Sequence, residues 1–520
     1  MSLAWTPEQI LLGAAALLII SVIASKASGQ LGVPALVLFL GIGMLAGSEG
    51  VGGIYFDNAQ IAQAIGVVAL AFILFSGGLD TNWQSIQAVL WAGLALSTVG
   101  VVLTAMIVAL FVTFVLGLSL IEGLLLGAIV SSTDAAAVFA VLRSRGVQLK
   151  GTLEPLLELE SGSNDPMAVL LTLGFTRLLI APDTPLTELG LLFVKQAAFG
   201  LVGGYVFARL SVIIINRIRL SYDGLYSVLT IAIVLLSYAA TAAVGGSGFL
   251  ATYITGLVMS RYDFVHKRSL RHFHDGIAWL MQIAMFLTLG LLVFPSQLVP
   301  IAGAALLIAA VLTLVARPIA VFISLLPFRM GLRAKLLVSW VGLRGATPIV
   351  LATFPLLAGA PNANALFNLV FFVVISSVLV QGTTVPLVSR LLKVNVPAPS
   401  GRDNQRETRI SDFTAQLNEV HVGSDSSAAG RPIVALALPP NALVVLIRRG
   451  DEQIIPCGSS VIEAGDRLLV LANDRDLAET RRIIDDTGPA KPTSPATNHS
   501  STPTKQAAPL SAGAPPEQST

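Results

Sequence analysis

Two carboxylates, an amide and two hydroxyls are grouped inside one apolar segment of this chain. They belong to the run ESGSNDP at residues 160–166, which lies between apolar residues at 155–157 and 168–171. An ionisable side chain at membrane depth costs about 2.5–3.5 kcal/mol by insertion scales. A chain that keeps Glu160 and Asp165 at such a depth is expected to use them to hold a cation, a proton, or each in turn.

Two other apolar segments also contain polar interruptions. The run SSTD at 131–134 places four polar residues in a row, and such residues compete with the helix backbone for hydrogen bonds. We expect an unwound turn there that aims carbonyl groups into a cavity, as discontinuous transporter helices do. The run GLRGATP at 342–348 ends in Pro348, which cannot donate to the carbonyl of Arg344, so a second break is expected.

These interruptions predict a site for a monovalent cation. The guanidinium of Arg344 must find an anion at membrane depth, and we predict Glu160 as its partner. Arg317, which precedes a proline in the preceding apolar segment, is an accessory candidate. An alkali cation is hard and prefers oxygen ligands, by extension of the rule for hard divalent cations. The candidate ligands are Asp165, Ser161, Asp134 and the carbonyl near Thr133. With Glu160 neutralised, the remaining carboxylate can hold a cation or a proton but not both, which gives exchange.

The composition places these groups in a membrane protein. The chain has 520 residues, of which 54% are hydrophobic and 12% charged, and its mean hydropathy is +0.79. Soluble domains average about 25% charged residues, so we predict an all-α polytopic membrane protein. The net charge of +2 offers no basic patch for nucleic acid. The single cysteine, Cys457, excludes an intramolecular disulfide framework.

A helix needs about 20 apolar residues to cross a bilayer, and this rule predicts about 13 transmembrane helices. They are expected near 8–26, 31–48, 60–78, 91–116, 121–142, 155–180, 189–214, 222–243, 247–260, 276–294, 299–326, 334–358 and 364–389. Lys and Arg concentrate in cytoplasmic loops. The loop charges fit an outside N-terminus and a cytoplasmic C-terminal domain at the inner cell membrane. His266, His272 and His274 are then expected in a cytoplasmic loop, where solvated side chains are favoured over a pH sensor.

The composition changes after Lys393. We predict a transmembrane domain at 1–393, a linker at 394–412, a small α/β domain at 413–485 and a disordered tail at 486–520. Short apolar runs separated by Gly, Pro and Asp are typical of strands. The expected strands lie at 432–436, 442–447, 452–456 and 466–471, with a hairpin turn at 448–451 and a closing helix from 476 to 484.

With these motifs in place, residues 8–390 resemble the monovalent cation:proton antiporter family of the NhaP type. The matching parts are STD at 132–134, ESGSNDP at 160–166 and GLRGA at 342–346. The resemblance implies two inverted six-helix repeats around an extra helix, broken crossing helices, a homodimer and elevator-type alternating access. One departure concerns Asp134, which is followed by Ala135 where the family often has proline.

The resemblance also implies roles for single residues. Asp165 becomes the carboxylate that cation and proton share, with Ser161 and the carbonyl of Thr133 as co-ligands. Asp134 becomes an acidic member of the site. The Glu160–Arg344 pair fixes the crossed helices. Asn164 stands where an electrogenic relative has a second Asp, which implies electroneutral exchange of one cation for one proton.

Residues 405–486 resemble the TrkA-C domain, the C-terminal lobe of potassium-conductance regulators, through the run AGDRL at 464–468. Such domains dimerise and regulate potassium movement, in some cases through a small-molecule effector, which the resemblance assigns to 413–485. The predicted function is therefore exchange of cytoplasmic potassium for external protons. No G-x-G-x-x-G stands between strand and helix, so neither NAD nor another cofactor is expected.

Several alternatives remain at this stage. A sodium/proton antiporter would use the same oxygen ligands. A potassium channel would need a filter such as Thr-Val-Gly-Tyr-Gly, which the chain does not have. An organic-anion exchanger would need a positively charged pocket, whereas this site is acidic. An ATP-driven pump would need G-x-x-x-x-G-K-[ST], which is missing, and no enzymatic activity is expected.

Overall fold

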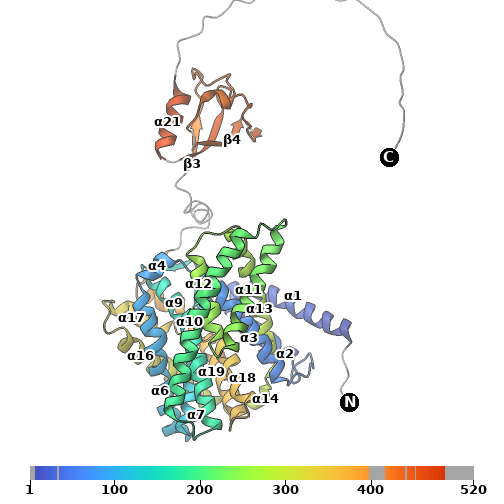
Figure 1. Cartoon of the computed structure of the whole chain (residues 1–520), viewed down its shortest axis with the longest axis vertical. Helices are drawn as coiled ribbons and strands as arrows, with labels where there is room; N and C mark the ends of the chain where they lie inside the picture. Colours follow the sequence, from blue (N-terminus) through green and yellow to red (C-terminus); the bar gives the residue numbers. More distant parts are fainter. Residues whose placement is uncertain are drawn as a thin grey trace, which may run out of the picture. The chain divides into compact units, whose positions relative to one another are not determined.

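The structure is a computed structural model that describes residues 6–31, 34–397, 416–439, 442–450, 452–472 and 474–486. The chain divides into two compact units, residues 1–398 and 399–520 (Figure 1). Each unit is described by itself. The expected disordered tail lies outside the described residues from 487 onward, and so does most of the expected linker.

The first unit is almost entirely helical. Its first nine helices are α1 (Pro7–Leu31), α2 (Ala35–Ala46), α3 (Ala59–Asp80), α4 (Trp83–Gln87), α5 (Leu90–Ala95), α6 (Val101–Leu116), α7 (Leu120–Ser131), α8 (Ala135–Ser144) and α9 (Leu153–Ile180). The others are α10 (Leu186–Arg217), α11 (Asp223–Ala243), α12 (Gly248–Ser260), α13 (Lys267–Leu292), α14 (Pro295–Leu298), α15 (Ala302–Val311), α16 (Arg317–Ser324), α17 (Leu332–Trp340), α18 (Thr347–Leu357) and α19 (Ala363–Leu391).

Several of these helices have the length and composition of membrane spans. Within the described residues, 9 helical segments are long and apolar enough to cross a bilayer. Three shorter apolar helices, α2, α12 and α18, accompany them. Helix α9 has 28 residues and coincides with the expected sixth span, including its acidic run. Every expected span overlaps one of these elements, which confirms a polytopic helical membrane protein, while the number of crossings stays a prediction.

Two expected spans are broken where polar runs were predicted to break them. In the fifth, α7 ends at Ser131 and α8 begins at Ala135; in the twelfth, α17 ends at Trp340 and α18 begins at Thr347. The spans before them also match. A π-helical turn, η1 (Leu96–Gly100), joins α5 to α6, and a second, η2 (Leu312–Ala316), joins α15 to α16. Broken helices and π-helical turns thus recur in the same order in both halves of the unit.

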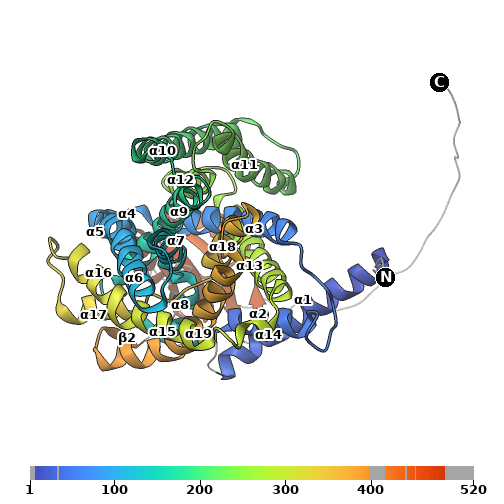
Figure 2. The same cartoon turned by 90° about the horizontal axis from the view of Figure 1, so that it is seen from below.

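The helices of this unit form two groups. One contains α1, α2, α3 and α10 to α13, and the other contains α5 to α9 and α15 to α19. In Figure 2, α10 and α11 lie together at one edge, away from α15, α16 and α17. Within the first group, α2 crosses α13 closely, because a Cβ on Gly43 would lie 2.9 Å from the Cα of Gly290. Small residues at such crossings let membrane helices pack through their backbones.

Two of the three histidines differ from the expectation of a loop, whereas His266 lies just before α13. His272 and His274 lie inside α13, which begins at Lys267. His274 is buried, its Nε2 lies 2.9 Å from the hydroxyl of Thr230, and its ring meets that of Phe75 edge-on. The expectation failed because α13 extends beyond the apolar residues that marked the span.

The second unit contains a four-stranded antiparallel sheet in the order β3-β6-β4-β5. Its elements are β3 (Gln416–His421), the 3-10 helix η3 (Ile433–Leu436), β4 (Leu443–Arg449), β5 (Glu452–Ile454), β6 (Arg467–Ala472) and α21 (Asp474–Asp485). The predicted hairpin and closing helix are confirmed. The strand expected at 432–436 is wrong, because this stretch coils into η3 and ends at Ala437 in the left-handed region. Sequence reasoning also missed β3.

A short sheet of the first unit overlaps the expected linker. Strand β1 (Val147–Leu149) pairs antiparallel with β2 (Asn395–Pro397), and the Lys150 nitrogen donates to the Val394 carbonyl at 2.9 Å. Residues 394–397 therefore belong to the membrane unit and not to a free linker. Polar composition alone did not reveal this pairing, because it is made by backbone groups.

Candidate functional site

The break between α7 and α8 packs against the acidic run of α9. The Ser161 hydroxyl donates to the carbonyl of Thr133 at 2.8 Å and accepts from the backbone nitrogen of Ala135 at 3.0 Å. The Asn164 amide donates to the Thr133 hydroxyl at 2.6 Å. The structure therefore brings together Ser161, Asn164 and Thr133, which sequence reasoning grouped. It does so because the unwound turn exposes backbone groups that a continuous helix would use itself.

Asp165 lies at the centre of this arrangement. Its side chain is buried, with 9% of its surface exposed. The Ser132 hydroxyl donates to Oδ1, and the Thr347 hydroxyl donates to Oδ2 at 3.0 Å. A carboxylate in an apolar interior is costly unless it is hydrogen-bonded or paired. The two broken helices supply those hydrogen bonds from either side.

Asp134 joins the two breaks. Its carboxylate caps α8 by accepting from the nitrogen of Ala137 at 3.0 Å, and its own backbone nitrogen donates to the carbonyl of Leu343 at 2.8 Å. Gly345 faces this carboxylate so closely that any Cβ there would collide with it. The half-buried Asp134 is therefore held at the crossing by contacts from both breaks.

The expected Glu160–Arg344 ion pair is corrected by the structure. In the described part of the chain, Glu160 pairs with Arg317, with Nη1 and Oε1 2.5 Å apart. Arg344 instead donates from Nη1 to the carbonyls of Ser131 at 2.5 Å and Ser132 at 2.8 Å. Those carbonyls end α7, where the helix dipole favours a positive charge. Arg344 thus finds partial negative charge in the backbone, and the accessory candidate Arg317 takes the carboxylate.

Sequence reasoning did not select two residues that contact Asp165. Ser132 and Thr347 both lie inside runs that were singled out, but neither was chosen as a site residue. The available signal was the position of each hydroxyl beside an expected break. Their contact with Asp165 depends on how the breaks cross, which residue types do not specify.

A cavity of about 560 Å³ opens between the two groups of helices. It reaches Ala136 and Ala137 at the start of α8, close to Asp134. Its lining residues are Ser25, Ser28, Pro34, Ala35, Leu36, Ile73, Ser76, Gly77, Asp80, Ala136, Ala137, Ala140, Val141, Arg143, Ser144, Arg145, Asp275, Ala278, Trp279 and Gln282. On its wall, Asp80 pairs with Nε of Arg271 at 3.1 Å. A cavity whose wall includes charged side chains such as Asp80 can bring a hydrated ion close to the crossing.

The chemistry available at the site is that of oxygen. Asp165, Asp134, Asn164 and the flanking hydroxyls offer ligands for a hard monovalent cation. Among the described residues, no group of three or more His, Cys, Asp or Glu side chains is placed to hold a resident metal ion. The arrangement suits reversible binding of a cation or a proton to a carboxylate.

Comparison with known proteins agrees with these features. Residues 14–391 match the family model described as the sodium/hydrogen exchanger, transmembrane, and residues 417–485 match that of the TrkA-C domain. The chain is 40% identical to the K(+)/H(+) antiporter NhaP of Alkalimonas amylolytica over 473 residues, which are 90% of this chain and 82% of that protein. It is 41% identical to the K(+)/H(+) antiporter NhaP2 of Shewanella baltica over 471 residues, 88% of this chain and 80% of the relative.

The fold is also found among solved structures. The sodium proton antiporter MjNhaP1 from Methanocaldococcus jannaschii, solved at pH 8, superposes with a TM-score of 0.64 at 23% identity. The match covers 74% of this chain and 99% of that structure. With the family model covering most of the membrane unit and close relatives covering most of the chain, this protein belongs to the sodium/hydrogen exchanger family of cation/proton antiporters and carries a C-terminal TrkA-C domain.

Proposed function

We propose that the protein exchanges cytoplasmic potassium for external protons, with both ions competing for Asp165. The observation that supports this proposal is the buried carboxylate held by Ser132 and Thr347 where two broken helices cross. The potassium assignment is supported by the two relatives, each about 40% identical and named as K(+)/H(+) antiporters. A single carboxylate binds a cation or a proton but not both, so each ion must leave before the other enters.

The charges around the crossing support electroneutral exchange. Glu160 is compensated by Arg317 in a pair whose side chains are 1% and 4% exposed. Arg344 and Asp134 carry opposite charges at the same crossing. Asn164 adds no charge next to Asp165. The site is therefore neutral with either one monovalent cation or one proton on Asp165, which corresponds to one cation for one proton.

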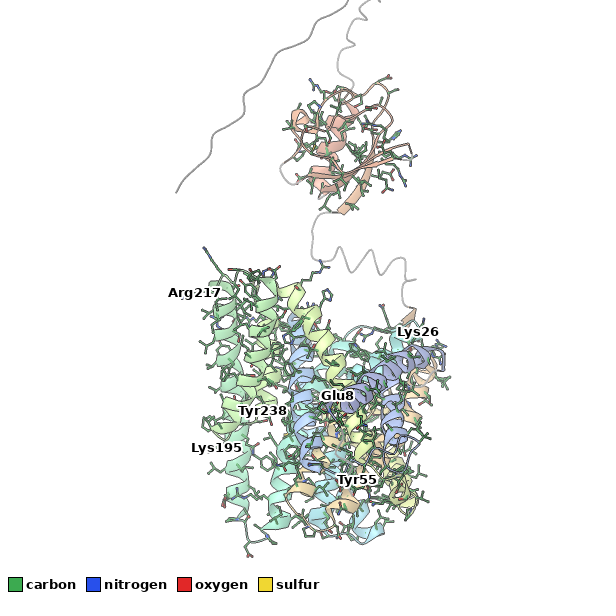
Figure 3. All side chains as sticks on the ribbon, turned by 90° about the vertical axis from the view of Figure 1, so that its right-hand side faces the viewer. Glu8, Lys26, Tyr55, Lys195, Arg217 and Tyr238 are labelled. Atoms are coloured by element: carbon green, nitrogen blue, oxygen red, sulfur yellow. The ribbon has the colours of Figure 1, made fainter. Side chains whose placement is uncertain are left out.

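Access from the cytoplasm is assigned to the cavity between the two helix groups. Arg143 and Arg145 line it and belong to a segment expected on the cytoplasmic side. Figure 3 shows Lys26 and Arg217, two further residues expected on that side, towards one end of the unit, with Tyr55 towards the other. We place the N-terminus outside and the C-terminal domain in the cytoplasm of a cell whose inner membrane holds the protein.

Alternating access is assigned to movement of one helix group against the other. The group with α7, α8, α9, α17 and α18 contains the whole site, so it can carry Asp165 across as a body in an elevator-type cycle. The other group, which contains α1, α3 and α10 to α13, would stay fixed and form a homodimer. The domain at 413–485 would regulate transport through a small-molecule effector.

A sodium/proton antiporter is the second candidate, because the solved structure with the same fold is a sodium proton antiporter. Oxygen ligands alone do not separate the two ions. The candidates predict different responses to the same experiment, since only one of them moves protons when potassium is the sole alkali cation.

The test uses purified full-length protein in liposomes that contain a pH-sensitive dye. A potassium or sodium gradient is imposed, with and without valinomycin to clamp the voltage. Potassium-driven proton movement that the clamp leaves unchanged is the expected result, and Asp165→Asn should abolish it. A response to sodium alone would favour the second candidate. Ion flux without proton movement, or full exchange by Asp165→Asn, would contradict the proposal.

A further inference from the structure

Two hydroxyl groups from distant parts of the chain bracket the Asp165 carboxylate. Ser132 follows the last residue of α7 and reaches Oδ1, and Thr347 is the first residue of α18 and reaches Oδ2 at 3.0 Å. Both residues are buried, with 1% and 8% of their surface exposed. Each break therefore contributes one hydroxyl to the same carboxylate.

The backbone oxygens of the first break each accept a hydrogen bond from the protein. The carbonyls of Ser131 and Ser132 accept from Arg344, and the carbonyl of Thr133 accepts from Ser161. Discontinuous helices commonly offer such carbonyls to transported ions. Here each of these three carbonyls already accepts one hydrogen bond from the protein. An ion at Asp165 would have to share each oxygen with that donor, so side-chain oxygens become more important as ligands.

The two hydroxyls have acceptor capacity to spare. A hydroxyl carries one proton and two lone pairs. Ser132 and Thr347 direct their protons at Asp165, and among the described residues no donor is hydrogen-bonded to either oxygen. The amide oxygen of Asn164 is likewise buried without a hydrogen-bond donor in the described part of the chain. The two hydroxyl oxygens lie against the same carboxylate, and oxygen is the ligand that a hard cation prefers.

We propose that Thr347 and Ser132 are cation ligands of the transport site, a role that rests on the proposed antiport at Asp165. When a cation approaches Asp165, both hydroxyls rotate about their C–O bonds and turn lone pairs towards the ion. When the cation leaves, the two hydroxyls rotate back and again donate their hydrogen bonds to the carboxylate. The same two groups thus stabilise the charged carboxylate before binding and complete the oxygen shell after it, so that no backbone rearrangement is needed at the ligands.

Thr347 is the sharper of the two for a test, because valine has nearly the same shape and lacks the oxygen. We expect Thr347→Val to raise the KM for potassium about tenfold, the size expected for losing one contact to a charged group, and to change the maximal rate by less than about twofold. Thr347→Ser keeps the hydroxyl and should stay close to the wild type. A merely structural role for the threonine would not separate KM from the maximal rate in this way.

Thr353 provides a matched control on the same helix. It is fully buried, and its hydroxyl donates to the carbonyl of Val350 at 2.6 Å, away from Asp165. Thr353→Val should leave the KM for potassium unchanged. Ser132→Ala tests the other hydroxyl and should raise the KM in the same direction, which keeps the proposal testable if Thr347→Val does not fold as judged by size-exclusion chromatography.

Direct binding separates this inference from the antiport proposal. Potassium binding to the purified full-length protein is measured by isothermal titration calorimetry next to the liposome assay. Weaker binding by Thr347→Val and Ser132→Ala supports the ligand role even if the wild type moves no protons, a result that would overturn antiport alone. Unchanged binding and unchanged KM in both variants, or a Thr347→Ser protein as impaired as Thr347→Val, would overturn the ligand role and leave antiport standing.

Discussion

The membrane unit and the C-terminal domain each hold an arginine against a buried carboxylate, in different surroundings. In the membrane unit, Arg317 and Glu160 are 4% and 1% exposed, so both charges are removed from solvent. In the C-terminal domain, Arg449 grips the fully buried Asp466 with Nε and Nη2, both at 2.9 Å, while 31% of its own side chain stays exposed. Both partners are buried in the first pair, whereas only the carboxylate is buried in the second.

The difference shows what each pair does for its region. Arg449 also binds Glu463 at 2.6 Å and the carbonyl of Val461 at 3.0 Å, so its guanidinium ties together the turn that leads into β6. A bidentate arginine of this kind gives geometric specificity as well as energy. Arg317 instead compensates the charge of Glu160 within the buried crossing of the broken helices. When a partly exposed ion pair loses one partner, water can hydrate the remaining charge. The remaining charge of a fully buried pair has no such access to water.

The largest effect is expected from removing one partner of the buried ion pair. Arg317→Met leaves Glu160 as an uncompensated buried charge, which costs about 3–5 kcal/mol of unfolding free energy. The melting temperature of the purified protein, followed by the loss of its monodisperse peak in size-exclusion chromatography, should fall sharply. The double variant Arg317→Met/Glu160→Gln removes both charges and should recover most of the loss. A double variant no more stable than the single one would show that the pair is not the source of the effect.

A smaller loss is expected at Arg344. In Arg344→Lys the positive charge remains, but the shorter side chain is not expected to reach both carbonyls that Nη1 now contacts. A buried carbonyl left without a donor costs about 1–3 kcal/mol. The melting temperature of Arg344→Lys should therefore lie between those of the wild type and Arg317→Met. Proton exchange by this variant should also be slower than that of the wild type. A wild-type melting temperature together with a wild-type exchange rate would mean that the hydrogen bonds of Arg344 to these carbonyls do not stabilise the crossing.

The sequence predicts the helix breaks well because their causes are local. Four polar residues at 131–134, or glycines before Pro348, disrupt a helix wherever it packs. The partner of Glu160 was predicted wrongly because Arg317 and Arg344 are both buried arginines near the same crossing. Which of them reaches the carboxylate depends on how η2 and the second break orient the side chains. Only the packing decides this.

The contacts of Thr347 and the strand β3 were hidden for related reasons. Thr347 meets Asp165 across 182 residues of sequence, and no period or composition marks that contact. Strand β3, QLNEVH, lacks the continuous apolar run that identified its neighbours, yet it pairs with β6 along its full length. The strand is stabilised by this pairing, which its amino-acid composition did not predict.

For the partly exposed pair Arg449–Asp466, we expect acid to destabilise the C-terminal domain. Burial alone would raise the pKa of Asp466, but Arg449 and the backbone nitrogen of Glu463 lower it below its ordinary value of 3.8. The charged carboxylate therefore contributes stability above that ordinary value, and the contribution is lost as the pH falls through the lower folded-state pKa. Hydrogen–deuterium exchange of the full chain should show protection factors of β4 and β6 that hold at neutral pH and drop only in strong acid.

The control for this pH dependence is the arginine itself. Arg449→Met removes the groups that favour the charged form, so protection of β4 and β6 should be lower at neutral pH and should begin to fall at a higher pH than in the wild type. The membrane helices should keep their protection in both proteins. An Arg449→Met protein with the wild-type pH profile would contradict the role given to this pair.

The smallest effect concerns a side chain that has no charged partner among the residues that the structure describes. Cys457 is exposed, and its sulfur lies 3.1 Å from the Ser459 hydroxyl and 3.3 Å from that of Ser460. These hydrogen bonds stabilise the thiolate and lower the pKa of the thiol to about 7. Because the thiolate is the nucleophile, the rate of alkylation by iodoacetamide should rise with pH and reach half its maximum near neutrality. Ser459→Ala should move that midpoint upward without changing the melting temperature, since an exposed thiol, unlike Glu160, is hydrated when it loses a partner. A midpoint that stays in place would show that water, rather than the serine, sets the charge of this thiol.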